Sequence, residues 1–160
     1  MNWLNHNWLP LLSRCTLLLL LSGCAPGKHA FLIVQTCLRD ERGVAMFMEE
    51  LRSIATAENM TFIDNSESTA EQLEDVGHTG SQRTAGSRVI NIGVQRSDGV
   101  GVTAGNLGLL GFEVALGFSE GSDAEFAHAF ADRVVARLQN YWQIEVVPAG
   151  TGAKSKGGCP

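Results

Sequence analysis

Cysteine and histidine are the side chains of this sequence with the richest chemistry, and the chain contains four of each. A thiolate at Cys37, activated by His78 or His128, would make a nucleophile and base pair of the kind that hydrolases use. Glu125 and His128 lie three residues apart on a predicted helix and match part of a di-iron motif, which needs a second copy and further carboxylates. Cys37 and Cys159 have no histidine pair nearby in the sequence at the spacing of zinc ligands, so they do not indicate a metal site. We therefore assign no catalytic residue and no metal ligand.

The glycine spacing also suggests a ligand site that the surrounding sequence does not support. Gly99, Gly101 and Gly105 approach a dinucleotide-binding loop, but the third glycine lies one place late and the segment is typical of a hairpin. A phosphate cradle needs a helix N-terminus at that point. A phosphate-binding GxxxxGK[ST] loop, a G-x-S-x-G elbow and an HExxH pair are also missing from the sequence. We expect a non-catalytic protein without a cofactor, and a hydrolase with an unrecognised site is the alternative.

An apolar run near the N-terminus ends at a cysteine. Five leucines, residues 17–21, are followed by Ser22, Gly23 and Cys24. The run is shorter than the roughly 20 residues that span a bilayer, and it suits the apolar part of a secretory signal. Leu21-Ser22-Gly23-Cys24 resembles the lipobox of bacterial lipoproteins in all four positions. The resemblance implies cleavage before Cys24 and transfer of a diacylglyceryl group to its thiol.

This resemblance, which covers only the first 24 residues, also implies where the protein resides. Residues 1–23 would be the signal peptide, and residues 24–29 the lipidated cysteine with a short linker. Because each buried methylene adds about 0.8 kcal/mol, two or three acyl chains such as palmitate hold a protein on a membrane permanently. In this family an aspartate after the cysteine retains the protein in the inner membrane. Ala25 therefore favours the outer membrane, with the domain in the periplasm and the inner membrane as the alternative.

Two cysteines remain once the lipoprotein resemblance is accepted. Cys15 leaves with the signal peptide and Cys24 carries the lipid, so Cys37 and Cys159 are left. An even pair of cysteines in an oxidising compartment predicts a disulfide bond. Two free thiols, or an intermolecular bridge through Cys159, are the alternatives.

The remaining chain has the size and charge of one small acidic domain. The sequence carries 17 acidic and 12 basic side chains, and one of the basic ones, Arg14, lies in the signal. An acidic domain without a basic stripe is a poor nucleic-acid binder. We expect a single domain over residues 30–150, followed by a tail rich in glycine and lysine over residues 151–160.

Hydrophobic periodicity predicts the elements of this domain. Strands are expected at 30–37, 60–64, 88–95, 100–105, 112–118 and 143–150. Two amphipathic helices are expected at 40–58 and 123–141, with a short helix at 68–76 between them. The order predicts an α+β fold, an antiparallel or mixed sheet with two main helices. Without the inserted short helix, the order is compatible with a ferredoxin-like fold.

Local signals refine the helices and one turn. Ser68 with Glu71, and Ser122 with Glu125, match capping boxes at the starts of two helices. The helix over 123–141 is expected to bury a stripe that ends at Tyr141. His128 and Asp132 lie one helical turn apart and are expected to share a hydrogen bond. Asp98-Gly99 favours a tight hairpin.

A small acidic, lipid-anchored domain without a catalytic motif predicts a binding protein with a protein partner. This organisation, a lipobox followed by one small α+β domain without an enzyme motif, resembles that of the lipid-anchored periplasmic immunity proteins. Those proteins inhibit toxins delivered by contact-dependent secretion. The alternative is an assembly or structural subunit of a larger envelope complex. Candidate binding residues are His78 and Arg83 in the polar segment 77–87, and Leu107 and Leu109 in the bend 105–111.

Overall fold

The computed structural model describes residues 30–75, 89–107, 111–157 and 159. Within these ranges the chain forms the elements β1 (Leu32–Cys37), α1 (Glu41–Ala57), β2 (Thr61–Asp64), α2 (Ser66–Asp75), β3 (Asn91–Gln95), β4 (Val100–Asn106), β5 (Glu113–Glu120), α3 (Ala124–Leu138) and β6 (Glu145–Val146). The predicted order of strands and helices is confirmed. Residues 1–29, with the lipobox and Cys24, lie outside the described residues.

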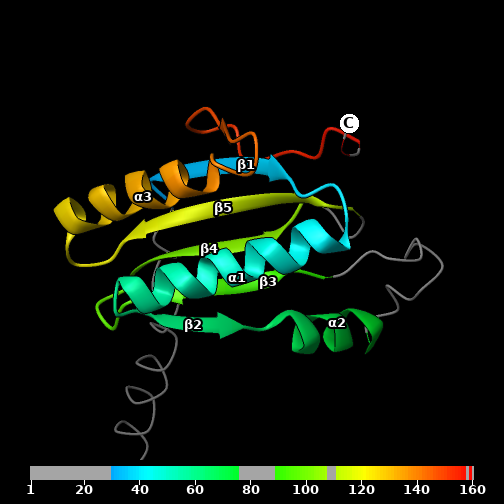
Figure 1. Cartoon of the computed structure of the whole chain (residues 1–160), viewed down its shortest axis with the longest axis horizontal. Helices are drawn as coiled ribbons and strands as arrows, with labels where there is room; N and C mark the ends of the chain where they lie inside the picture. Colours follow the sequence, from blue (N-terminus) through cyan, green and yellow to red (C-terminus); the bar gives the residue numbers. More distant parts are fainter. Residues whose placement is uncertain (1–29, 76–88, 108–110, 158, 160) are drawn as a thin grey trace, which may run out of the picture.

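The strands form one six-stranded sheet in the order β2-β3-β4-β5-β1-β6, and all neighbouring strands are antiparallel (Figure 1). The α+β class is therefore confirmed. Helix α1 connects β1 to β2, and α3 connects β5 to β6, so each main helix joins two parallel strands that are not neighbours. Strand β1 alone separates β5 from β6, whereas three strands separate β1 from β2. The hairpin of β3 and β4 thus widens the sheet beyond a simple ferredoxin-like arrangement.

Helix α1 forms as its sequence predicts. The side chain of Asp40 caps the helix by accepting a hydrogen bond from the backbone N–H of Gly43 at 2.7 Å, which satisfies one of the unpaired donors of the first turn. A Cβ atom at Gly43 would lie 1.9 Å from the carbonyl oxygen of Leu38, so only glycine fits there. The apolar side chains that recur at helical spacing along this amphipathic helix are all buried: Val44, Phe47, Met48, Leu51, Ile54 and Ala55.

The other two helices begin and end at different residues from those predicted. In α3 the capping side chain is Asp123, which accepts from the N–H of Phe126 at 3.1 Å, so the predicted box of Ser122 and Glu125 is wrong. The helix ends at Leu138, before Tyr141, whose side chain is exposed rather than buried.

Helix α2 begins at Ser66, so the predicted capping box of Ser68 and Glu71 is also wrong. The carboxylate of Asp64 accepts a hydrogen bond from the backbone N–H of Ser66 at 3.0 Å.

The two faces of the sheet differ in what covers them. Helices α1 and α3 pack on one face (Figure 1), against inward side chains such as Val34, Leu116 and Phe118. The side chains that alternate with these point to the other face, which none of the described helices covers and which we call the open face. By strand register it carries Ile33, Gln35, Cys37, Thr61, Ile63, Asn91, Gly93, Gln95, Gly101, Thr103, Gly105, Glu113, Ala115, Gly117 and Ser119.

The sheet also has two distinct ends. Strands β1, β2 and β4 run from an end that we call the Phe31 end to an opposite end that we call the Cys37 end. The turns 96–99 and 120–123 lie at the Phe31 end. The Cys37 end holds Leu107, the start of β5, and Cys159 near the C-terminus. In the described part of the chain we find no helix long and apolar enough to cross a bilayer.

Candidate binding site

The C-terminal segment is fastened across the Cys37 end of the open face. Cys37, the last residue of β1, forms a disulfide with Cys159, and their Cα atoms lie 5.5 Å apart. This is the pairing that the sequence predicts. Because the sulfur of Cys37 is bonded, it has no thiolate, and the nucleophile pair with a histidine is not formed in this state.

A buried carboxylate on the neighbouring strand holds the same segment. Glu113, the first residue of β5, stands opposite Cys37 in the strand register and is only 7% exposed. Its two carboxylate oxygens accept from the backbone N–H of Lys156 at 2.9 and 3.1 Å, and it also accepts from the hydroxyl of Ser155. Burying a charge is costly unless it is hydrogen-bonded. The C-terminal segment therefore supplies the donors that this carboxylate requires.

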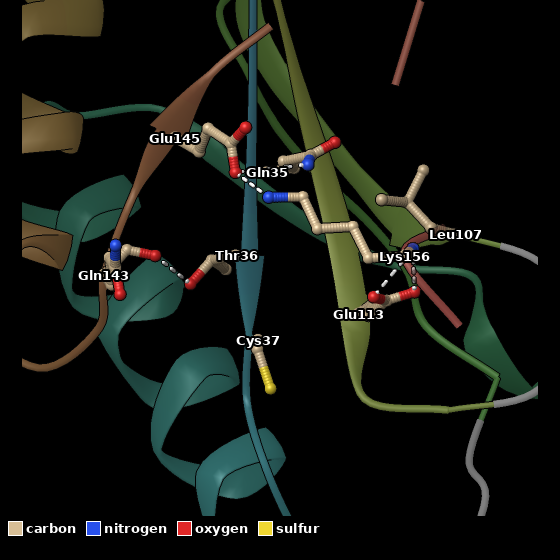
Figure 2. Close-up of a pocket in the computed structure, with 8 residues that line it drawn as sticks. All are labelled: Gln35, Thr36, Cys37, Leu107, Glu113, Gln143, Glu145 and Lys156. Carbon is tan, nitrogen blue, oxygen red and sulfur yellow. Dashed lines mark hydrogen bonds and ion pairs between the residues drawn. The ribbon is translucent and has the colours of Figure 1, made fainter. Parts of the chain in front are cut away.

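An exposed ion pair joins the segment to the edge of the sheet. The ammonium of Lys156 pairs with the carboxylate of Glu145 in β6, and Gln35 of β1 donates to the same carboxylate at 3.5 Å (Figure 2). The hydrogen bond from Lys156 lowers the pKa of Glu145. Both partners are more than half exposed, so solvent weakens the pair. It orients the lysine rather than holding the segment in place.

These groups line one pocket at the Cys37 end of the sheet (Figure 2). The hydroxyl of Thr36 donates to the backbone carbonyl of Gln143 at 3.0 Å, which fixes the chain ahead of β6 against β1. The backbone N–H of Leu107 donates to the carbonyl of Glu113 at 2.9 Å. The pocket is lined by Gln35, Thr36, Cys37, Leu107, Glu113, Gln143, Glu145 and Lys156.

Most of the side chains that line this pocket are polar or charged. Its amides, carboxylate and ammonium can donate and accept hydrogen bonds at several points, and Leu107 adds an apolar wall. Within the described ranges, no three histidine, cysteine, aspartate or glutamate side chains come together as metal ligands. The pocket therefore offers several hydrogen-bond donors and acceptors beside one apolar wall.

A second polar cluster lies at the Phe31 end. The guanidinium of Arg96 donates two hydrogen bonds to Asp98, at 2.9 and 2.6 Å, and one to Asp123, at 2.8 Å, and it stacks 4.1 Å from the ring of Phe126. The bond from Arg96 holds the pKa of both aspartates below the ordinary value. The cluster ties the β3–β4 turn to the start of α3, which is a structural role.

The predicted binding residues are only partly placed by the structure. Leu107 lies in the pocket, as part of its lining. His78, Arg83 and Leu109 lie outside the described residues. The structure brings Leu107 together with Glu113, Glu145, Gln143 and Lys156, none of which was predicted from the sequence.

Of the site residues that the sequence analysis missed, Glu113 is the one that the sequence could have indicated. It is a single carboxylate inside an otherwise apolar strand, and a buried carboxylate needs a hydrogen-bond partner. Its partners lie more than 40 residues further along the chain, so no local pattern identifies them.

His128 makes contacts that differ from the predicted one. Its ring lies 3.2 Å from the carboxylate of Glu120, and its centroid is 4.2 Å from that of Phe31. The predicted bond with Asp132 on the same helix is replaced by this contact with the end of β5. In the described ranges no second Glu-x-x-His pair accompanies Glu125 and His128.

No protein-family model matches the sequence, and no curated protein matches it significantly.

Proposed function

We propose that the protein is a lipid-anchored, periplasm-facing binding protein, and that it acts as an immunity-type inhibitor of a secreted toxin. The observation that carries the proposal is the open face, whose centre carries the short side chains of Gly93, Thr103, Gly105, Ala115 and Gly117 and whose Cys37 end holds a polar pocket. Thr103 is exposed there, between Gly93 and Gly117 in neighbouring strands. Short side chains let a partner approach the sheet closely, and a flat surface suits a protein better than a small molecule, which prefers a deep cleft.

Two further features support the cellular setting. The Cys37–Cys159 disulfide is the kind of bond that persists in oxidising compartments such as the bacterial periplasm. The lipobox resemblance at Leu21–Cys24 accounts for a membrane anchor. An acidic domain would also attract a basic toxin and speed the encounter.

Deletion of the gene is the first test of this proposal. Cells that lack the protein should be killed on contact with the parent strain, and a plasmid copy should restore survival. If the deletion strain survives contact unharmed, the inhibitor function is wrong. Labelling with radioactive palmitate, compared with a Cys24→Ser variant, tests the anchor separately.

A pair of charge substitutions tests the open face. Thr103→Lys places a long cation on the exposed part of that face, whereas Ala129→Lys places the same cation on an exposed position of α3, on the helix-covered side. Thr103→Lys should abolish protection in the contact assay at an unchanged protein level, while Ala129→Lys should protect fully. Equal protection by both variants would contradict binding through the open face.

The second candidate function, an assembly subunit of an envelope complex, is favoured by one edge of the sheet. Strand β6 is only two residues long; its Val146 is 61% exposed, and Tyr141, which lies shortly before it in the chain, is 52% exposed. Exposed apolar side chains beside an unpaired strand edge suit stable association with another subunit. A Val146→Lys variant that leaves protection intact but releases the protein from a large complex would favour this function.

A further inference from the structure

The lipid anchor and the strand directions together define how the domain stands on the membrane. This inference rests on the proposed anchor at Cys24. The chain is fixed to the sheet from Phe31 onward, because the backbone N–H of Phe31 donates to the carbonyl of Phe118 at 2.9 Å. The ring of Phe31 also lies against His128 at 4.2 Å and against Phe118 at 6.4 Å between centroids. The point at which the tether joins the domain is therefore the Phe31 end.

The tether is short compared with the domain. Residues 25–30 separate Cys24 from Phe31, so seven Cα-to-Cα steps reach about 25 Å at full extension. A flexible chain of this length has a root-mean-square span of about 15 Å. Strand β1 alone is about 20 Å long, and the 17 residues of α1 extend about 25 Å.

These lengths make the two orientations of the domain unequal. If the Cys37 end faced the lipid, the tether would have to run back along the whole sheet near its full extension, at a cost in chain entropy. With the Phe31 end toward the lipid, the tether keeps its ordinary span. We infer that the domain stands on the leaflet with its Phe31 end, and presents the Cys37 end with its pocket to the aqueous side.

The residues at the Phe31 end are suited to this position. The turns 96–99 and 120–123 are tied together by Arg96 through Asp98 and Asp123, which holds these two turns side by side. Among the described residues at the Phe31 end, Arg96 is neutralised by two aspartates and Glu120 lies nearby, so these residues supply no excess of cations to draw the domain onto anionic lipid. The orientation comes from the tether and not from lipid binding.

The orientation narrows the kind of partner that fits the pocket. Leu107, Glu113 and Lys156 stand at the end of the domain that is farthest from the leaflet. A soluble protein that arrives through the periplasm reaches this end directly. A partner embedded in the same leaflet would meet the Phe31 end instead. The pocket therefore fits a soluble protein, which agrees with a secreted toxin more than with a membrane-embedded complex.

Two positions on one helix measure the orientation directly. Ala45 and Ala57 are both exposed on α1, and 12 residues of helix place them about 18 Å apart. A dye is attached to p-azidophenylalanine at either position, so that no new thiol disturbs the disulfide. The acylated full-length protein is then reconstituted into phosphatidylcholine vesicles that contain an acceptor-labelled lipid.

Energy transfer should place the dye at residue 57 closer to the lipid plane than the dye at residue 45, by up to about 18 Å. Equal heights, or the reverse order, on vesicle-bound protein overturn the orientation alone. A purified chain that stays in the aqueous phase overturns the anchor and the orientation together. The two proposals therefore fail in distinguishable ways.

A longer tether provides the matched control. Inserting about 20 Gly/Ser residues between Pro26 and Gly27 raises the root-mean-square span to about 28 Å, which exceeds the length of the sheet. The height difference between the two dyes should then collapse, while acylation and vesicle binding stay unchanged. If the difference persists with the long tether, tether length is not its cause and the inference is wrong.

Discussion

The two ends of the sheet are each held by a polar cluster, and the clusters differ in how far along the chain their partners lie. At the Phe31 end, Arg96 joins Asp98, two residues away, and Asp123, 27 residues away. At the Cys37 end, Glu113 reaches Ser155 and Lys156, more than 40 residues on, and Cys37 reaches Cys159 across 122 residues. The first cluster forms between elements that the hairpin and the core already hold together. The second depends on the docking of a segment without regular structure.

The burial of the charges differs as well. The carboxylates of Asp98 and Asp123 face a cation and remain partly exposed. The carboxylate of Glu113 is buried and is satisfied by a backbone amide and a hydroxyl. Because a buried charge without partners is costly and a solvated one is not, we expect the Cys37 end to be the more sensitive of the two to substitution.

The largest expected effect is that of removing the disulfide. The double variant Cys37→Ser with Cys159→Ser frees a loop of 122 residues, which should lower the free energy of unfolding by about 2–5 kcal/mol. The urea midpoint of the purified protein measures this loss. Replacing both cysteines leaves no odd thiol that could form a dimer. An unchanged midpoint would show that the bond does not contribute to the stability of the folded state.

A smaller effect is expected from Glu113→Gln. The variant keeps one acceptor for the segment but loses the second, so the protein should lose about 1–3 kcal/mol of stability. In the background without the disulfide, the same substitution should cost much less, because the segment then docks weakly. A double-mutant cycle of urea midpoints gives the coupling. Additive effects would contradict the view that Glu113 and the disulfide hold one segment.

The smallest loss of stability is expected from replacing Arg96 at the Phe31 end, and this loss should depend on pH. Arg96 lowers the pKa of Asp98 and Asp123 in the folded protein, below the ordinary aspartate value of about 3.9. This stabilisation is therefore complete above the ordinary value, and it is lost as the pH falls toward the lower folded-state value.

Arg96→Met should remove this dependence. The variant should be less stable than the parent at neutral pH, and the difference should shrink at about pH 3 and below, as the aspartates become protonated. Urea midpoints across this pH range test the expectation, with Arg42→Met at an exposed position of α1 as the control. A difference that is the same at every pH would mean that Arg96 acts through packing on Phe126.

The sequence alone determined the elements of this protein and their order, because these depend on residues that are close along the chain. The apolar period of α1 identified its buried stripe, and Asp98-Gly99 identified the hairpin, in which Gly99 has a φ of 89°. Strand positions were also readable from their composition, although β6 is limited to Glu145–Val146 where a longer strand was predicted.

The tertiary structure decided which of these elements are neighbours. An alternating pattern tells which face of a strand is buried but not which strand lies beside it, so the order β2-β3-β4-β5-β1-β6 could not be deduced from the pattern. For the same reason the partners of Glu113, and the pairing of His128 with Glu120 instead of Asp132, became evident only in the fold. A side chain bonds to the group that folding brings within reach, and that distance is set by the packing of the whole sheet.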